Sequence, residues 1–123
     1  MKKPDFRKHR VDSLVELFRK HAAEQEQAML YGNQAKVNEL YWQLKAVREE
    51  LKSREGDQRR ALLQLYNDPS PQVRIKAIKA TLAVAPEKAR RALEELANSK
   101  EYPASGEAGM SVWALDEGIF KPE

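Results

Sequence analysis

Apolar residues recur at every third or fourth position along most of this chain, a spacing that places them on one face of a helix. The pattern predicts about six helices, with the expected ranges 13–31, 34–54, 57–66, 71–84, 87–98 and 106–118. Most prolines and glycines fall near the ends of these ranges, where they interrupt a helix at the least cost. The predicted fold class is therefore all-α.

The first two predicted helices are similar in length and are separated by a short link, which predicts an antiparallel hairpin. Gly32 can take the positive φ that often ends a helix, and Asn33 can cap the start of the second helix. Ser13 and Glu16 have the spacing of a capping box, so we expect Ser13 to cap the first helix. Ser105 is the expected cap of the last helix.

One segment, Leu62–Val84, has a more specific pattern. An apolar helix end is followed by a turn that contains proline and aspartate. A helix then begins with Ser70 as N-cap and Pro71 at its first position, where a missing amide costs nothing. This segment resembles one HEAT-type repeat, a helix pair that stacks on others into an α-α superhelix. The resemblance implies that Arg74 braces the turn by pairing with Asp68.

The composition favours one soluble domain. For the 123 residues we expect a single HEAT-like domain over 11–122, preceded by a basic, disordered arm at 1–10. No apolar run approaches the ~20 residues that span a bilayer, and the basic N-terminus lacks the apolar core of a secretory signal. The chain has no cysteine, which excludes disulfides, thiolate zinc sites and cysteine nucleophiles. We therefore expect a cytoplasmic protein without membrane contact.

The net charge of +3 is unevenly distributed, with basic residues dominating 1–10 and 59–91 and acidic residues dominating 94–123. One interpretation is a mixed, solvated surface, and the other is a basic face that binds nucleic acid. That face would be formed by Arg59, Arg60, Lys76, Lys79, Lys88, Arg90 and Arg91. The outward side of the fourth predicted helix is expected to carry Gln72, Lys76, Lys79 and Ala83.

Trp42 is the strongest single candidate for contact with a partner. At about 100° per residue it falls opposite the apolar stripe of its own helix, beside Lys45. An exposed tryptophan is a common anchor of protein interfaces. The alternative is that this helix packs on two sides and buries the ring. The complete set of candidate contact residues is Trp42, Lys45, Lys76, Lys79, Arg59 and Arg60.

No motif in the chain indicates catalysis. His9 and His21 lack the serine or paired acid that a triad needs, and His21 is expected to be a partnered core histidine. The sequence shows no phosphate-binding loop and no metal-ligand spacing, so no metal or cofactor is expected. Trp113 and Asp116 are the residue types that HEAT-like DNA glycosylases use, but we expect Trp113 to pack the last helix instead. The sequence thus favours a non-enzymatic protein.

Three groups of residues together resemble a small bacterial family catalogued as a domain of unknown function. They are Leu51–Leu63, Pro71–Arg74 with Ala83–Pro86, and Ala108–Met110 with Ala114–Gly118. The resemblance implies an all-α, HEAT-like fold and supplies no catalytic residues. Small solitary HEAT-like proteins sometimes act as immunity partners of bacterial toxins or as adaptors, an analogy from fold and size. We therefore expect a protein-binding module of this kind, with nucleic-acid binding as the alternative and the oligomeric state open.

Overall fold

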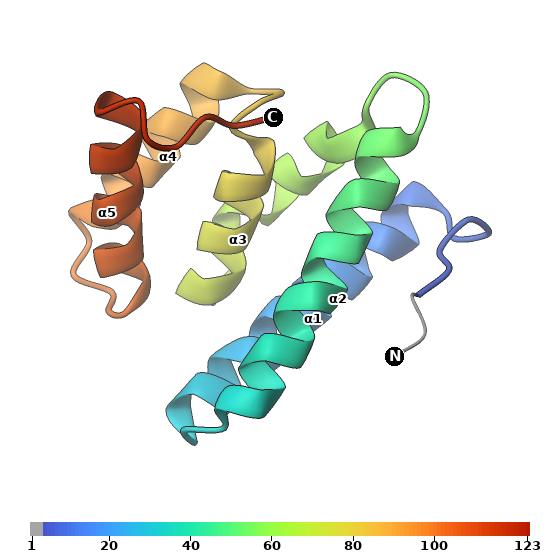
Figure 1. Cartoon of the computed structure of the whole chain (residues 1–123), viewed down its shortest axis with the longest axis horizontal. Helices are drawn as coiled ribbons and strands as arrows, with labels where there is room; N and C mark the ends of the chain where they lie inside the picture. The colour runs from blue at the N-terminus through green and yellow to red at the C-terminus, as the bar shows by residue number, and fades with distance from the viewer. Residues whose placement is uncertain (1–3) are drawn as a thin grey trace. The chain divides into compact units, whose positions relative to one another are not determined.

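The computed structural model describes residues 4–123, and this part of the chain consists of helices and connecting turns. Its elements are, in order, α1 (Val11–Leu30), α2 (Gln34–Ser53), η1 (Gln58–Asn67), α3 (Pro71–Thr81), α4 (Pro86–Ala97) and α5 (Ala104–Asp116) (Figure 1). Five are α-helices and η1 is a 3₁₀ helix. The predicted all-α class is thereby confirmed. The chain divides into two compact units between Ala61 and Leu62.

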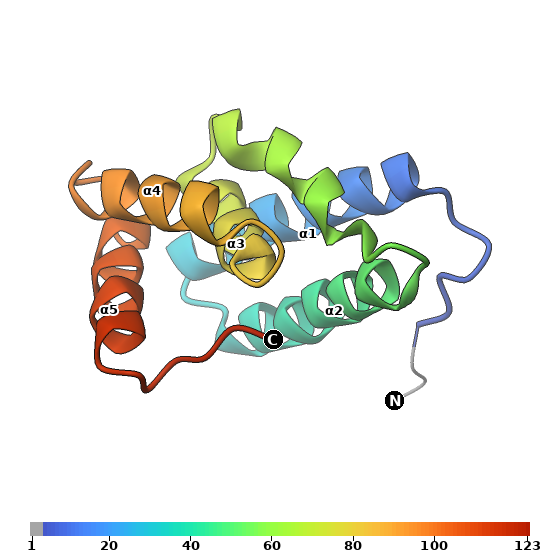
Figure 2. The same cartoon turned by 90° about the horizontal axis from the view of Figure 1, so that it is seen from above.

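In the first unit, α1 and α2 form an antiparallel hairpin, and they lie side by side in both views (Figures 1 and 2). Its buried apolar residues include Leu14, Phe18, Ala22, Leu40, Leu44, Val47 and Leu51. Gln25 is also buried, and its Nε2 donates a hydrogen bond of 3.1 Å to the carbonyl oxygen of Val37. This bond links the two helices and satisfies a polar group that burial would otherwise penalise.

The two predicted caps of the hairpin have different outcomes. Asn33 caps α2 as predicted, because its Oδ1 accepts a hydrogen bond of 3.1 Å from the amide of Lys36. The Ser13 cap was wrong. α1 begins two residues earlier, and Asp12 in its first turn accepts a bond of 2.8 Å from the amide of Ser13. The carboxylate that was to complete the box, Glu16, pairs with Arg19 instead.

Residues 4–10, where we expected disorder, form a turn that contacts the C-terminal end of α2. The Phe6 ring is 8% exposed, and the Phe6 carbonyl accepts a hydrogen bond of 3.0 Å from Nη2 of Arg54. Arg54 in turn pairs with Glu50 at 3.0 Å. Lys2 and Lys3, also assigned to the basic arm, lie outside the described residues.

In the second unit, α3 packs on α4 and α4 packs on α5. Ser70 caps α3 as predicted, since its Oγ accepts a bond of 3.2 Å from the amide of Val73. α3 ends earlier than expected, at Thr81. The Thr81 hydroxyl donates a hydrogen bond of 2.9 Å to the carbonyl oxygen of Ala77. The buried apolar cluster consists of Ile75, Ile78, Leu82, Ala89, Leu93, Leu96, Ala104 and Ala108.

The last helix differs from its prediction in start and orientation. α5 begins at Ala104, so Ser105 is a buried residue within the helix and does not cap it. The buried side of α5 carries small residues: Ala104, Ser105, Ala108 and Ser111. Because these face inward, Trp113 is turned outward and is 51% exposed, which contradicts the expected packing of its ring. Phe120, beyond the helix, packs against the buried cluster instead.

Candidate binding surface

The side of α2 that points away from its buried stripe carries two exposed aromatic rings. Leu40 and Leu44 are buried, whereas Trp42 between them is 58% exposed and Tyr41 is 47% exposed. Two helical positions separate Trp42 from Leu40, which corresponds to a rotation of about 200°. The structure therefore places the Trp42 ring on the exposed side of α2, away from α1.

Trp42 contacts both Tyr41 and Lys45, and we call these three residues the α2 aromatic surface. The two rings meet edge to face, with centroids 5.2 Å apart and an interplanar angle of 79°. The Lys45 ammonium lies 5.2 Å from the centroid of the Trp42 ring, within cation–π range. Each contact restricts the rotation of a side chain before any partner arrives. Such pre-ordered aromatic residues lose little conformational entropy on binding.

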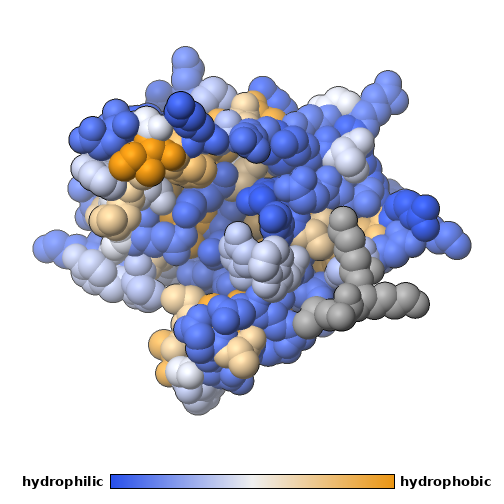
Figure 3. All heavy atoms as spheres, in the orientation of Figure 1, coloured by the Kyte–Doolittle hydropathy of each residue, from blue (hydrophilic) through white to orange (hydrophobic). Residues whose placement is uncertain are grey.

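The rim of this surface is polar and mixed in charge. Asn38 and Glu49 are exposed on the same side of α2. Arg48 Nη2 lies 3.4 Å from Glu49 Oε1, and Lys36 Nζ lies 3.7 Å from Glu39 Oε2. The space-filling view shows paler side chains interrupting the hydrophilic surface over the middle of α2 (Figure 3). An apolar centre with a polar rim is the usual arrangement of a protein-binding patch.

Arg59 and Arg60 are placed differently from each other. The Arg59 side chain is 7% exposed, and its Nη2 lies 2.7 Å from Asp57 Oδ2. The hydrogen bonds of this pair lower the pKa of Asp57 and raise the pKa of Arg59. Arg59 is thus engaged within its own chain, whereas Arg60 is exposed. Of the two, Arg60 alone is placed to meet a ligand.

Lys76 and Lys79 converge on one carboxylate rather than forming an open basic pair. Their ammonium nitrogens lie 3.9 Å and 3.3 Å from Glu107 Oε2 on α5. Lys79 also lies 5.6 Å from the centroid of the Phe120 ring. The outward side expected for α3 needs a correction, since Gln72 is buried and, of the four residues assigned to it, Ala83 is the exposed one. Buried residues occur all around α3, so its angular pattern does not identify a free side.

The predicted brace between Arg74 and Asp68 was wrong. Arg74 Nη2 donates a hydrogen bond of 2.8 Å to Glu101 Oε1, in the loop before α5. Asp68 instead accepts a bond of 3.0 Å from the amide of Ser70 and so stabilises its own turn. The bond from Arg74 is the main cause that lowers the pKa of Glu101.

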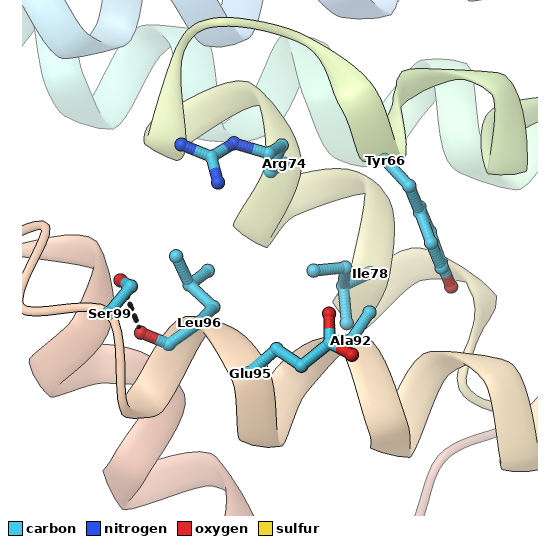
Figure 4. A pocket seen from close by; sticks show the side chains of 7 residues that line it. All are labelled: Tyr66, Arg74, Ile78, Ala92, Glu95, Leu96 and Ser99. Atoms are coloured by element: carbon cyan, nitrogen blue, oxygen red, sulfur yellow. Dashed lines mark hydrogen bonds between the residues drawn. The ribbon is translucent and has the colours of Figure 1, made fainter.

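Arg74 also lies at one end of a groove of about 260 Å³ in the second unit. The side chains that line it come from η1, α3, α4 and the start of the following loop, and they are Tyr66, Arg74, Ile78, Ala92, Glu95, Leu96 and Ser99 (Figure 4). The Ser99 hydroxyl donates a hydrogen bond of 2.7 Å to the carbonyl oxygen of Leu96. The Tyr66 hydroxyl bonds Thr81. Three of the polar side chains at the groove, Tyr66, Arg74 and Ser99, therefore each make a hydrogen bond within the protein.

Asp116, named with Trp113 as a glycosylase-type residue, is engaged in an ion pair. Asp116 Oδ1 lies 2.7 Å from Arg90 Nη2, and Arg90 Nε lies 3.6 Å from Glu94 Oε2. The hydrogen bond to Asp116 is the main cause that raises the pKa of Arg90. Lys88 and Arg91, on the same helix as Arg90, are exposed.

His21 is partly buried in α1, and its Nδ1 is a buried atom without a hydrogen-bond partner among the described residues. This corrects the expectation of a partnered core histidine. Burial disfavours the charged imidazolium and lowers the pKa of His21.

Within residues 4–123, no three acidic, histidine or cysteine side chains are grouped to hold a metal ion. No described helix is long and apolar enough to cross a membrane.

Sequence reasoning missed part of the exposed apolar surface of the first unit. The spacing of Tyr41 fits the apolar stripe of α2, yet this residue lies at the stripe's edge and is half exposed. The turn of the hairpin also exposes Leu30 (73%) and Tyr31 (83%). The available signal was the uncharged run from Gln27 to Ala35 in a chain with 33% charged residues.

Comparison with known proteins gives the family but not a role. The family model described as Domain of unknown function (DUF2019) matches residues 12–116. The crystal structure of the protein RPA1889 from Rhodopseudomonas palustris CGA009 is similar, with 45% identity and a TM-score of 0.96 over 98% of this chain and 100% of that chain. No curated protein matches significantly. The chain therefore belongs to the DUF2019 family of domains of unknown function.

Proposed function

We propose that this chain is a non-enzymatic, protein-binding module that contacts its partner through the α2 aromatic surface. The observation that carries the proposal is the exposed Trp42 ring, held between Tyr41 and Lys45. Tryptophan and tyrosine dominate the residues whose removal costs most at protein interfaces. A single-turn cluster of two ordered rings and a cation has no evident role in the stability of the hairpin, since its rings are about half exposed.

The HEAT-like architecture remains part of this proposal. It is supported by the turn between η1 and α3, with its Ser70 cap and Pro71, and by the packing of α4 on both α3 and α5. The proposed biological role is that of an immunity protein or adaptor, by analogy with small helical-repeat proteins. A cytoplasmic location goes with it, because a chain without cysteine suits a reducing compartment.

The shifted pKa values support a non-enzymatic role. The lowered pKa values of Asp57 and Glu101 arise first from hydrogen bonds to Arg59 and Arg74. Ion pairs of this kind are common structural features, whereas catalytic groups usually owe their shifts to a cleft and to like charges. The perturbed carboxylates are therefore explained by the local structure.

The proposal is tested by affinity capture from the host, with the wild-type chain, a Trp42→Ala variant and a Trp113→Ala control compared by quantitative mass spectrometry. The control removes the other exposed tryptophan, on a different helix. We expect a protein that the wild type and the control enrich and that Trp42→Ala loses by roughly tenfold or more. Equal enrichment by all three variants would contradict a role for the α2 aromatic surface.

Nucleic-acid binding is the second candidate, favoured by the exposed cations Arg60, Lys88 and Arg91. It is weakened by the ion pairs that engage Arg59, Lys76, Lys79 and Arg90. Phosphate binding releases counterions, so the affinity should fall steeply with salt. A fluorescence-anisotropy titration with single- and double-stranded DNA and RNA at low salt decides it: no binding removes this candidate.

A further inference from the structure

We propose that a second copy of this chain docks on the α2 aromatic surface, with the two α2 helices antiparallel. The inference rests on the proposed function, because it uses the same surface and names its partner. The twofold axis would pass between Gln43 and Leu44, at the level of the aromatic rings. The outward side of α2 belongs entirely to the first unit.

The outward residues of α2 recur with the three- and four-residue spacing of a helix–helix seam. In order they are Ala35, Asn38, Trp42, Lys45, Glu49 and Lys52. Each of them is exposed or partly exposed, whereas the buried positions of α2 are Leu40, Leu44, Val47 and Leu51. α2 thus presents a second, continuous seam on the side that α1 does not cover.

This seam is complementary to itself when it is reversed. A twofold axis between Gln43 and Leu44 places each Trp42 opposite Lys45 of the second copy. The same axis places Asn38 opposite Glu49 of the second copy, so that an amide faces a carboxylate. The contact between Lys45 and Trp42 already observed within one chain, at 5.2 Å, shows that this ring accepts an ammonium group.

One flank of the seam is also complementary to itself when it is reversed. Tyr41 and Arg48 lie on one flank of α2, and in an antiparallel pair that flank meets its own copy. Tyr41 then comes beside Arg48 of the second copy, which gives a further cation–aromatic pair. The two aromatic residues of each chain therefore face the two cations of the other.

A parallel arrangement lacks this complementarity. It would place Lys45 against Lys45 and Glu49 against Glu49 of the second copy, and like charges at a seam are unfavourable. The charge pattern thus selects the antiparallel pair. One helix–helix contact buries less than the roughly 1,200–2,000 Å² of a standard interface, so we expect a weak, concentration-dependent dimer.

Sedimentation velocity over a range of concentrations up to several hundred micromolar tests the proposal. The wild type should shift toward twice the 14.1 kDa mass of one chain as the concentration rises. Trp42→Ala and Lys45→Glu should raise the dissociation constant roughly tenfold or more, while Lys45→Arg and Trp113→Ala should leave it within about twofold. A wild-type chain that stays monomeric throughout, or a dimer that Trp42→Ala does not weaken, overturns the proposal.

Cysteine cross-linking tests the direction of the helices, with no background because the chain has no cysteine. An equimolar mixture of Asn38→Cys and Glu49→Cys chains should form a mixed disulfide-linked dimer under mild oxidation, faster than either variant cross-links with itself. Both positions are exposed, so the variants keep the fold, and circular dichroism checks this. Self-linking of each variant at the faster rate would indicate a parallel pair and overturn the antiparallel assignment.

The two proposals fail separately. A monomeric chain whose captured partner depends on Trp42 overturns the dimer and leaves the protein-binding module in place. A dimer that depends on Trp42, together with capture of no other Trp42-dependent protein, supports self-association and overturns the immunity or adaptor role.

Discussion

Arg74 and Glu101, 27 positions apart in sequence, form a hydrogen-bonded ion pair of 2.8 Å in the second unit. The Arg74 side chain is mostly buried, with 21% exposed, whereas that of Glu101 is 40% exposed. The pair ties the first turn of α3 to the loop that leads into α5. It takes the place of the expected brace between Arg74 and Asp68. Arg74 therefore stabilises the loop before α5 and not the turn before α3.

Replacing Arg74 should therefore destabilise the second unit. We expect Arg74→Ala to lower the free energy of unfolding by about 1–2 kcal/mol, because the bond to Glu101 and the packed side-chain stem are lost together. Glu101→Gln should cost less, since the amide oxygen can still accept from Arg74. Urea denaturation of the three proteins measures the order, and a larger effect for Glu101→Gln than for Arg74→Ala would argue against this account.

The buried cluster of the second unit should respond to truncation of Leu93. This side chain is fully buried and belongs to the apolar cluster that includes Ile78 and Leu96. Leu93→Ala should cost about 2–5 kcal/mol, since the cavity it leaves adds to the lost burial. Met110→Ala, at a residue 65% exposed on α5, is the matched control and should change stability by less than about 0.5 kcal/mol. Thermal denaturation distinguishes the two.

The partly buried imidazole of His21 should make the folded protein less stable in mild acid. Its pKa is lowered in the folded state, first by burial, so the unfolded chain binds the proton more readily. Stability should therefore fall as the pH drops below 6.5, the ordinary pKa of histidine, before the carboxylates titrate. His21→Leu should remove this part of the pH dependence between about pH 6.5 and 5 while leaving the acid transition at lower pH. Parallel slopes for wild type and variant in that window would refute it.

Two glycines should respond in opposite directions to alanine. Gly32 ends α1 with a φ of +68°, where a side chain is strained, so Gly32→Ala should destabilise by about 1 kcal/mol. Gly109 lies within α5, and an added Cβ would meet no atom within 4 Å. Gly109→Ala should stabilise by about 0.5–1 kcal/mol through helix propensity. Chemical denaturation of both variants against wild type tests the contrast in sign.

The features predicted correctly from sequence are those that depend on near neighbours. The helix spacing gave the all-α class, and the caps at Asn33 and Ser70 each need one amide three residues away. Ser13 and Ser105 carry the same kind of signal, but a helix that starts one or two residues earlier moves them inside it. Local preference at a helix start is worth only about 1 kcal/mol, so packing of the flanking residues can override it.

The candidate surface was predictable in part. The angle of Trp42 correctly placed it away from the buried stripe because α2 has a clear apolar side. The same reasoning failed for Gln72, since α3 has buried residues around most of its circumference and no single apolar side. The partner of Lys76 and Lys79 could not be predicted from the sequence either, because this partner, Glu107, lies on another helix. Pairing of surface charges depends on tertiary geometry, which the charge pattern of one helix does not contain.

The chain has two tryptophans, and each compact unit contains one of them, Trp42 on α2 and Trp113 on α5. Both rings are about half exposed, so phenylalanine should replace either with little effect on the fold. The tryptophan fluorescence of a Trp113→Phe chain then comes from the first unit alone, and that of a Trp42→Phe chain from the second. Two such chains, denatured side by side, would report whether the halves of the protein melt as one cooperative body or in succession, with no dye attached.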